Sequence, residues 1–215
     1  MDNYKLIHLD QMEASIVRRR LLGRSKADQT VATALVHALQ GKQCLSNIHI
    51  TEPQYVTNVY PLYFYWAHDQ HLKHREVYDH VFQEFPTDRF TMPEAELRPH
   101  VWRVADTEID ILVEDAEYFV FIEAKEPKPG HKVKFQNQGG VHQLVRQYVQ
   151  GRILEKRISK TFALATIGAN NGQMLEIKLN PTERALLQLV EEEKEVLQVI
   201  DLSWPSFVEV AQGGE

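Results

Sequence analysis

The uninterrupted apolar run Tyr118-Phe119-Val120-Phe121-Ile122 constrains this chain more than any other feature. A polar break at residues 114–117 precedes it, and the charged Glu123 and Lys125 follow it. Five consecutive aromatic and β-branched residues are typical of a central strand that is buried on both faces of a sheet. The run therefore predicts an α/β fold with a mixed central sheet flanked by helices.

The segments around this run support that fold class. Ile109, Ile111 and Val113 alternate with other residues at strand spacing, which predicts a strand over 108–113. Downstream, the pattern predicts a helix over 141–158, a strand over 162–167 and a short edge strand over 175–179. Asn180, Pro181 and Glu183 have the spacing of a helix N-cap, a first-turn proline and a capping-box glutamate.

The N-terminal part has a different pattern. Before Pro86 the apolar residues recur mostly at helical spacing, which predicts helices over 12–22, 27–39, 62–67 and 71–85. After Pro99 the period changes to that of strands. We therefore expect a mostly helical portion over 1–95 and a core with a C-terminal helix over 96–215, either as two parts or as one compact domain.

Composition excludes several classes of protein. The chain has 215 residues, 43% of them hydrophobic, which is enough for a sizeable core. Its net charge of −6 excludes a histone-like polycation. One cysteine, Cys44, allows neither an internal disulfide nor a cysteine-rich zinc site. Neither a signal peptide nor a membrane-spanning stretch is recognisable, so the sequence predicts a cytoplasmic protein with no membrane partner.

Charged residues gather where the central strand ends. If residues 114–117 form the turn of a hairpin, Asp110 lies opposite Phe121, and Glu123 is one diagonal step away on the same face of the sheet. Lys125 shares that face because side chains alternate along a strand. Two carboxylates on a largely buried face repel each other and lose solvation, and a bound divalent cation removes both costs. Oxygen ligands favour Mg²⁺ or Mn²⁺.

This arrangement resembles the PD-(D/E)XK nuclease superfamily. Ile109-Asp110, a break, and an apolar strand ending in Glu123-Ala124-Lys125 match its motif, with twelve residues between Asp110 and Glu123 and with Ile109 in place of the proline. The resemblance covers about a third of the chain, residues 96–168. It implies a restriction-endonuclease-like core in which Asp110 and Glu123 hold Mg²⁺ or Mn²⁺ and Lys125 is the catalytic lysine that positions the attacking water.

Two further features of that family match less closely. Members often carry Gln-x-x-x-Tyr on the next helix, whereas here Gln143 and Tyr148 are one residue too far apart. On a helical wheel Leu144, Val145 and Tyr148 share the core side and Gln143 lies opposite, so His142 competes with Gln143 for a place in the site. Members also often supply a glutamate from an earlier helix. The candidates are Glu76, Glu84 and Glu13.

The distribution of charge favours a nucleic-acid partner. Between residues 125 and 160 the chain has nine basic and only two acidic residues, although the whole chain is acidic. The basic ones are Lys125, Lys128, Lys132, Lys134, Arg146, Arg152, Lys156, Arg157 and Lys160. Because this segment begins at the predicted site, we expect phosphate to lie along it. The alternative is that this basic segment is only a solvated loop and helix face. Separately, the glutamates near the C-terminus predict the solvent-exposed side of a helix: Glu183, Glu191, Glu192, Glu193 and Glu195.

Together these features predict a metal-dependent nuclease that hydrolyses phosphodiester bonds in DNA, with Lys125 and Gln143 as catalytic residues and Asp110 and Glu123 as metal ligands. The sequence leaves open RNA as a substrate, the formation of a homodimer, and endonuclease or exonuclease action. The first alternative is a catalytically silent protein of the same fold that binds nucleic acid or protein, in which the charged residues form a structural cluster. The second is a histidine-metal enzyme built on His68, His71, His74 and His80.

Overall fold

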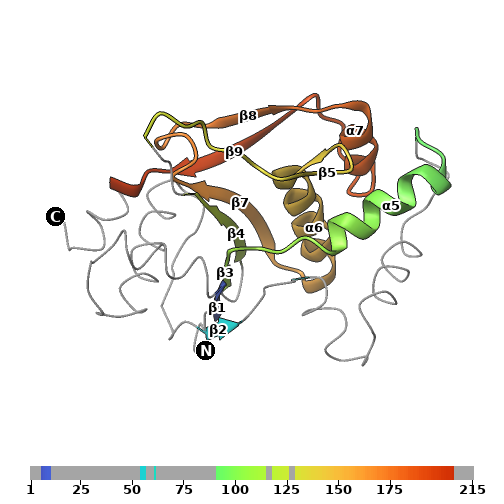
Figure 1. The fold of residues 1–215 in the computed structure, drawn as a ribbon. Coiled ribbons are helices and arrows are strands. Elements are labelled where there is room, and N and C mark those ends of the chain that lie inside the picture. The colour runs from blue at the N-terminus through green and yellow to red at the C-terminus, as the bar shows by residue number, and fades with distance from the viewer. Residues whose placement is uncertain are drawn as a thin grey trace.

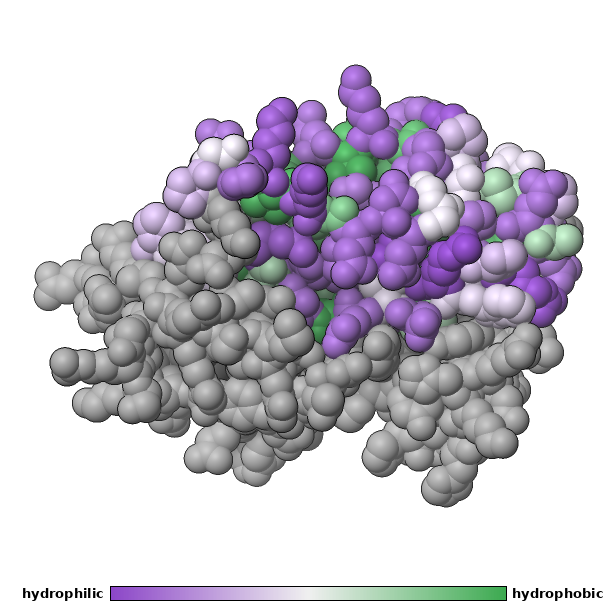
Figure 2. Space-filling view, in the orientation of Figure 1, coloured by the Kyte–Doolittle hydropathy of each residue, from purple (hydrophilic) through white to green (hydrophobic). Residues whose placement is uncertain are grey.

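A computed structural model describes residues 91–114, 118–125 and 129–205, together with Pro61 and the two strands at 6–10 and 54–56. These residues form a mixed α/β structure with a sheet flanked by helices (Figure 1). Polar side chains cover most of the described face seen in Figure 2, and apolar atoms show only between them. None of the described helices is long and apolar enough to cross a membrane.

The sheet has seven strands in the order β2-β1-β3-β4-β7-β9-β8. Its members are β1 (Leu6–Asp10), β2 (Gln54–Val56), β3 (Ile111–Glu114), β4 (Tyr118–Ala124), β7 (Thr161–Ile167), β8 (Leu175–Lys178) and β9 (Val196–Leu202). The central strands β4, β7 and β9 run parallel, while β3 and β8 pair antiparallel to β4 and β9. The apolar run is thus the centre of a mixed sheet, as the sequence predicts.

Three helices accompany this sheet: α5 (Glu94–Ala105), α6 (Gln143–Ile158) and α7 (Pro181–Gln188). Helix α6 connects the parallel strands β4 and β7 and packs on them, and α5 and α7 pack against α6 (Figure 1). A short hairpin, β5 (Asn137–Gln138) and β6 (Val141–His142), leads directly into α6. Helix α7 begins with the predicted capping box, since Asn180 and Glu183 bond each other's backbone N–H groups.

The predicted pairing of the first hairpin is wrong by two residues. Ile111 pairs with Ile122 and Leu112 with Phe121, so the register extended by one step sets Asp110 opposite Glu123, not opposite Phe121. The strand begins at Ile111, not at residue 108, because Thr107 and Glu108 accept hydrogen bonds from Arg146 and Gln147 of α6. A shift of two residues preserves the alternation of side chains, so the predicted face is unchanged.

Two other boundaries differ from the expected ones. Pro99 lies inside α5 and does not end the helical part, because Leu97, Val101 and Val104 on either side are fully buried and their burial outweighs one lost backbone hydrogen bond. The glutamate-rich C-terminal segment is not one helix. Helix α7 ends at Gln188, and residues 196–202 form the parallel strand β9, in which Leu197 and Val199 alternate into the core.

The predicted helical N-terminal portion is described only in small part. The helices expected over 12–22, 27–39, 62–67 and 71–85 lie outside the described residues. Strand β1, however, pairs antiparallel with β3 and parallel with β2. Residues from the predicted N-terminal portion therefore belong to the same sheet as the core, and the division at residue 95 stays a prediction.

Aromatic rings fill the space between the central strands and α6. Phe119, Phe121 and Phe162 are in mutual contact, with ring centroids 5.0 to 5.6 Å apart. Gly151 of α6 faces this cluster. A Cβ atom at Gly151 would lie 2.1 Å from the ring of Phe162, so the glycine is what lets the helix approach the sheet so closely.

We predict that Gly151→Ala destabilises the protein although alanine favours helices. Alanine gains about 1 kcal/mol of helix propensity over glycine, whereas overpacking a core costs about 1–3 kcal/mol. With so close a contact we expect a net loss of about 1–2 kcal/mol in the free energy of unfolding, measured by urea denaturation. In a Phe162→Leu background the same substitution should be neutral or stabilising. An equal effect in both backgrounds would place the strain elsewhere.

Candidate metal and phosphate site

The predicted site residues meet at the carboxyl end of β4. Glu123 is the last but one residue of β4 and is 1% exposed. Asp110 immediately precedes β3, and its Oδ2 accepts a hydrogen bond of 2.8 Å from the N–H of Ala124. Lys125 immediately follows β4, and its N–H bonds to the carbonyl of Ile167 on β7. The structure therefore brings Asp110, Glu123 and Lys125 to one edge of the sheet.

Three side chains donate hydrogen bonds to the Glu123 carboxylate. Lys125 Nζ lies 2.5 Å from Oε1, and Gln143 Nε2 donates to the same oxygen over 2.8 Å. Gln147 Nε2 donates to Oε2 over 2.6 Å and also lies 3.2 Å from the carbonyl oxygen of Glu108. A carboxylate accepts only, so these donors compensate the solvation that it loses on burial.

Gln143 belongs to this site, and the helical wheel was wrong to place it on the outer side of α6. Its side chain is 7% exposed because α6 is buried on both sides, by the sheet and by α5. Its Oε1 accepts a hydrogen bond from the N–H of Gln136, which ties the β5–β6 hairpin to the site.

Tyr148, expected in the core, is only partly buried, and its hydroxyl group donates to Glu192.

His142 caps α6 instead of contacting Glu123. Its Nδ1 accepts from the N–H of Leu144, and its ring packs at a tilt against that of Phe135 with centroids 5.1 Å apart. Burial lowers the pKa of His142, and Arg146 and Lys125 lower it further against the opposing effect of Glu183. The ring is therefore neutral at pH 7, as its role as a hydrogen-bond acceptor requires.

Arg146 is a buried cation beside the site that the sequence analysis assigned to a basic surface. It is 1% exposed, and its guanidinium group donates to Thr107 Oγ1 and to the carbonyl of Val141. Burial lowers the pKa of Arg146 to about 10, while the negative charge of Glu123 acts in the opposite direction. Arg146 thus stays charged at neutral pH and contributes positive potential to the site.

Sequence reasoning missed Gln147 and the buried role of Arg146. Gln143, Arg146, Gln147 and Gln150 recur at helical spacing and are all buried. Gln150 donates to carbonyls at the end of α5, including those of Val104 and Thr107. A polar stripe at i, i+3, i+4 and i+7 usually indicates a wet face. An apolar face with Leu144 and Val145 beside such a stripe is the pattern of any amphipathic helix, so nothing in the sequence indicated that these polar residues are buried.

Neighbouring strands fix the backbone of Lys125. Its carbonyl oxygen accepts a 2.6 Å hydrogen bond from the indole N–H of Trp204, just after β9. Gly168, just after β7, has a φ of 75°, and a Cβ there would lie 2.5 Å from that same carbonyl oxygen. The buried Asp201 holds the rest of this loop through the N–H groups of Ala169, Asn170 and Gly172. The lysine therefore projects from a rigid backbone.

The residues present fit a hydrated Mg²⁺ or Mn²⁺ ion. Magnesium in proteins is usually held by one or two carboxylates, with water and substrate phosphate completing its shell. Asp110 and Glu123 offer such a pair on adjacent strand ends. Among the described residues no three His, Cys, Asp or Glu side chains form a group that could hold a metal ion. Glu76, Glu84, Glu13 and the histidines between 68 and 80 lie outside the described residues.

The predicted basic segment divides into separate groups. Arg146 is buried, Arg152 pairs with Glu155 and Glu192, and Lys156 pairs with Glu191. Lys132 and Lys134 are exposed on the loop before β5. That loop reaches the site through Phe135, whose ring centroid is 5.4 Å from Lys125 Nζ. The exposed part of the segment therefore lies next to the candidate site.

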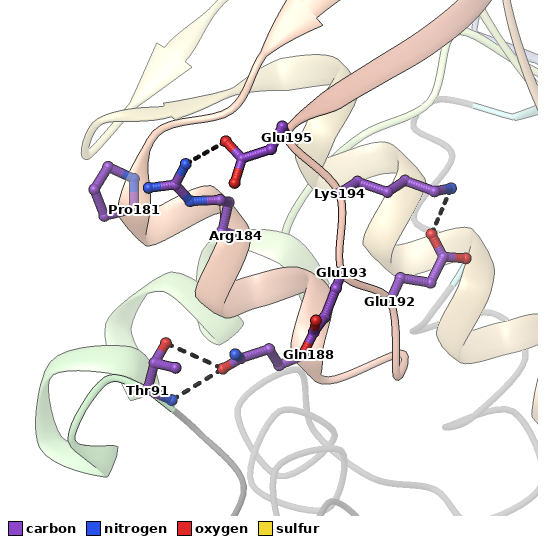
Figure 3. A pocket seen from close by; sticks show the side chains of 8 residues that line it. All are labelled: Thr91, Pro181, Arg184, Gln188, Glu192, Glu193, Lys194 and Glu195. Carbon is purple, nitrogen blue, oxygen red and sulfur yellow. Dashed lines mark hydrogen bonds and ion pairs between the residues drawn. The ribbon is translucent and has the colours of Figure 1, made fainter.

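A cavity of about 510 Å³ lies elsewhere, beside α7 (Figure 3). Eight residues line it: Thr91, Pro181, Arg184, Gln188, Glu192, Glu193, Lys194 and Glu195. Thr91 and Gln188 are hydrogen bonded across it, and Arg184 pairs with Glu195. Burial would raise the pKa of Glu192, but hydrogen bonds from Lys194 and Tyr148 outweigh it and lower the pKa. None of these residues belongs to the site around Glu123.

Comparisons with known proteins found no match: no family model, no curated protein and no solved structure is similar to this chain. The residues of the site itself are therefore what indicates a function.

We predict that Arg146→Met strongly destabilises the protein. Methionine fills similar space but leaves Glu123 without its buried counter-charge and the Val141 carbonyl without this donor. Removing one partner of a buried charged network costs about 3–5 kcal/mol. We expect a loss of about 3 kcal/mol in the free energy of unfolding, measured with denaturant. Arg157→Met, at an exposed position of the same helix, is the matched control and should change stability by about 0.5 kcal/mol or less. Equal effects of the two substitutions would contradict a buried electrostatic role.

Proposed function

We propose that this protein is a divalent-metal-dependent nuclease that hydrolyses phosphodiester bonds in DNA, with a restriction-endonuclease-like core. The observation that carries the proposal is the convergence of Asp110, Glu123, Lys125 and Gln143 at the end of the central strand. Two carboxylates can hold a hard cation that activates water and polarises phosphate, and a lysine beside them can stabilise charge that develops on phosphate.

Each residue has a distinct role in this proposal. Asp110 and Glu123 would hold Mg²⁺ or Mn²⁺, which when bound polarises phosphate and makes water more acidic. Lys125 orients the attacking water and stabilises negative charge that develops on phosphate. Gln143 fixes the Glu123 carboxylate from α6 and links it to the hairpin through Gln136.

The nucleic-acid strand would lie along the loop of residues 129–136. Lys132 and Lys134 are exposed there, and no other described residue forms an ion pair with them. Phe135 connects the loop to Lys125 and His142. Cations that are not neutralised by the protein are the ones that contribute to phosphate binding. RNA remains an alternative substrate.

The alternative function is that of a catalytically silent binding protein with the same core. The observation that favours it is the direct ion pair of Lys125 with Glu123, because a carboxylate with three donors is satisfied without a metal ion. The two functions differ in whether the protein cleaves nucleic acid when Mg²⁺ or Mn²⁺ is supplied.

We predict that the protein nicks or cleaves plasmid and oligonucleotide DNA in Mg²⁺ or Mn²⁺, and that Lys125→Met slows this about 100-fold or more. The substitution keeps much of the side chain's bulk and removes the charge that acts on developing phosphate charge. Initial rates should be measured with labelled oligonucleotides, and DNA affinity in Ca²⁺, where we expect a much smaller change.

Lys178→Met, on the exposed edge strand β8, is the matched control and should retain the wild-type rate. If Lys125→Met cleaves as fast as wild type, Lys125 is not catalytic. If wild type cleaves neither DNA nor RNA with either ion, the silent binding function replaces the nuclease.

We also predict that Lys132 and Lys134 contact phosphate. Reversing both charges to glutamate should weaken DNA binding and reduce the slope of log affinity against log salt by roughly 1.8, the value for two phosphate contacts. Binding should be measured by fluorescence anisotropy over a salt series. Reversal of Lys156 and Lys178, both exposed, changes the net charge equally and should leave the slope unchanged. Equal slopes in the wild type and both double variants would show that Lys132 and Lys134 do not contact phosphate and that the loop serves only solubility.

A further inference from the structure

The three donors on the Glu123 carboxylate differ in how firmly they are held. Gln147 is fully buried and Gln143 nearly so, and both project from the same helix, α6. Each amide makes a second contact: Gln143 Oε1 with the N–H of Gln136, and Gln147 Nε2 with the carbonyl of Glu108. Moving either glutamine would therefore break buried hydrogen bonds.

Lys125 is held less firmly. Its side chain is 21% exposed, whereas that of Glu123 is 1% exposed. Its other described contact is with the ring of Phe135, whose centroid is 5.4 Å from Nζ. An ammonium group can move over the face of a ring and keep such a contact. A lysine has a long flexible stem and gains hydration when its ammonium group moves outward.

Glu123 also retains a positive neighbour when the lysine leaves. Arg146 is buried close enough to Glu123 for the two charges to affect each other, and its guanidinium group is fixed by Thr107 and Val141. When Lys125 leaves, the carboxylate therefore keeps the two neutral amides and also the nearby positive charge of Arg146. The buried part of the site stays assembled, and one position on Oε1 becomes available to another cation.

We propose that Lys125 is an exchangeable partner of Glu123: its ammonium group occupies Oε1 in the absence of metal and gives up that oxygen when a divalent cation binds. This inference rests on the proposed function, since it concerns the same metal site. It explains how one lysine can stabilise the buried carboxylate in the free protein and still be available to phosphate. Gln143 and Gln147 hold the carboxylate in place throughout.

The proposal makes Lys125 a competitor of the metal ion. Lys125→Met should therefore tighten Mn²⁺ binding about threefold to tenfold, because a partly exposed ion pair no longer has to be broken and a positive charge is lost. Gln147→Leu should weaken Mn²⁺ binding, since it releases Oε2 from its fixed donor. Titration of the protein with Mn²⁺ by calorimetry, without nucleic acid, gives these affinities. Glu123→Gln is the control that should abolish Mn²⁺ binding. If Glu123→Gln does not fold, Asp110→Asn takes its place as the control.

A second measurement follows the lysine directly. The Nζ resonance of Lys125, assigned by its loss in Lys125→Met, should be protected from solvent exchange in the free protein and lose that protection on addition of Mg²⁺. If wild type binds Mn²⁺ and Lys125→Met binds it equally or more weakly, the exchange is wrong and the metal site stands. Binding by Lys125→Met alone would show that the lysine keeps Oε1 in the wild-type protein, which overturns the exchange and favours the silent binding function. If neither protein binds Mn²⁺, the proposed nuclease function fails and the exchange fails with it.

Discussion

The burial of one carboxylate at the end of the central strand governs the arrangement around it. Glu123 is almost entirely inaccessible to solvent, and an unpaired carboxylate there would cost several kcal/mol. Lys125, just after the same strand, and Gln143 and Gln147 of α6 donate hydrogen bonds that offset this cost. The positive charge of Arg146, also on α6, contributes as well. Helix α6 can therefore be buried on both sides although it has a polar stripe.

The same constraint connects distant parts of the chain. Gln147 and Gln150 reach the end of α5, and Gln143 holds the end of the loop that carries the exposed lysines. Trp204 and Gly168 fix the backbone from which Lys125 projects. A site at the carboxyl ends of parallel strands thus has its donors supplied by elements that are far apart in sequence, which is common in open α/β sheets. Such a rigid surround suits a carboxylate that must keep its position while one partner changes.

The ion pair at the centre of the site also explains why the two proposed functions are so close in structure. The ion pair of Lys125 with Glu123 satisfies the carboxylate in a protein that never binds metal. The same ion pair is the starting state in a protein in which a metal ion displaces the lysine. The geometry without metal is the same in both cases. The difference between them is one of relative affinity for Oε1, which is a thermodynamic quantity and not a feature of the fold.

The sequence by itself determined the central strand, its two flanking strands, helix α6 and the capping box of α7, because periodicity and capping residues act over a few neighbouring positions. It also determined that Asp110, Glu123 and Lys125 share a face, since alternation survives a register shift of two. Only the tertiary structure decided that Asp110 aligns with Glu123, that residues 196–202 form a strand, and that Gln143, Arg146 and Gln147 point inward. Those outcomes depend on packing of α6 between α5 and the sheet, and a polar stripe has the same pattern in sequence whether water or a buried carboxylate receives it.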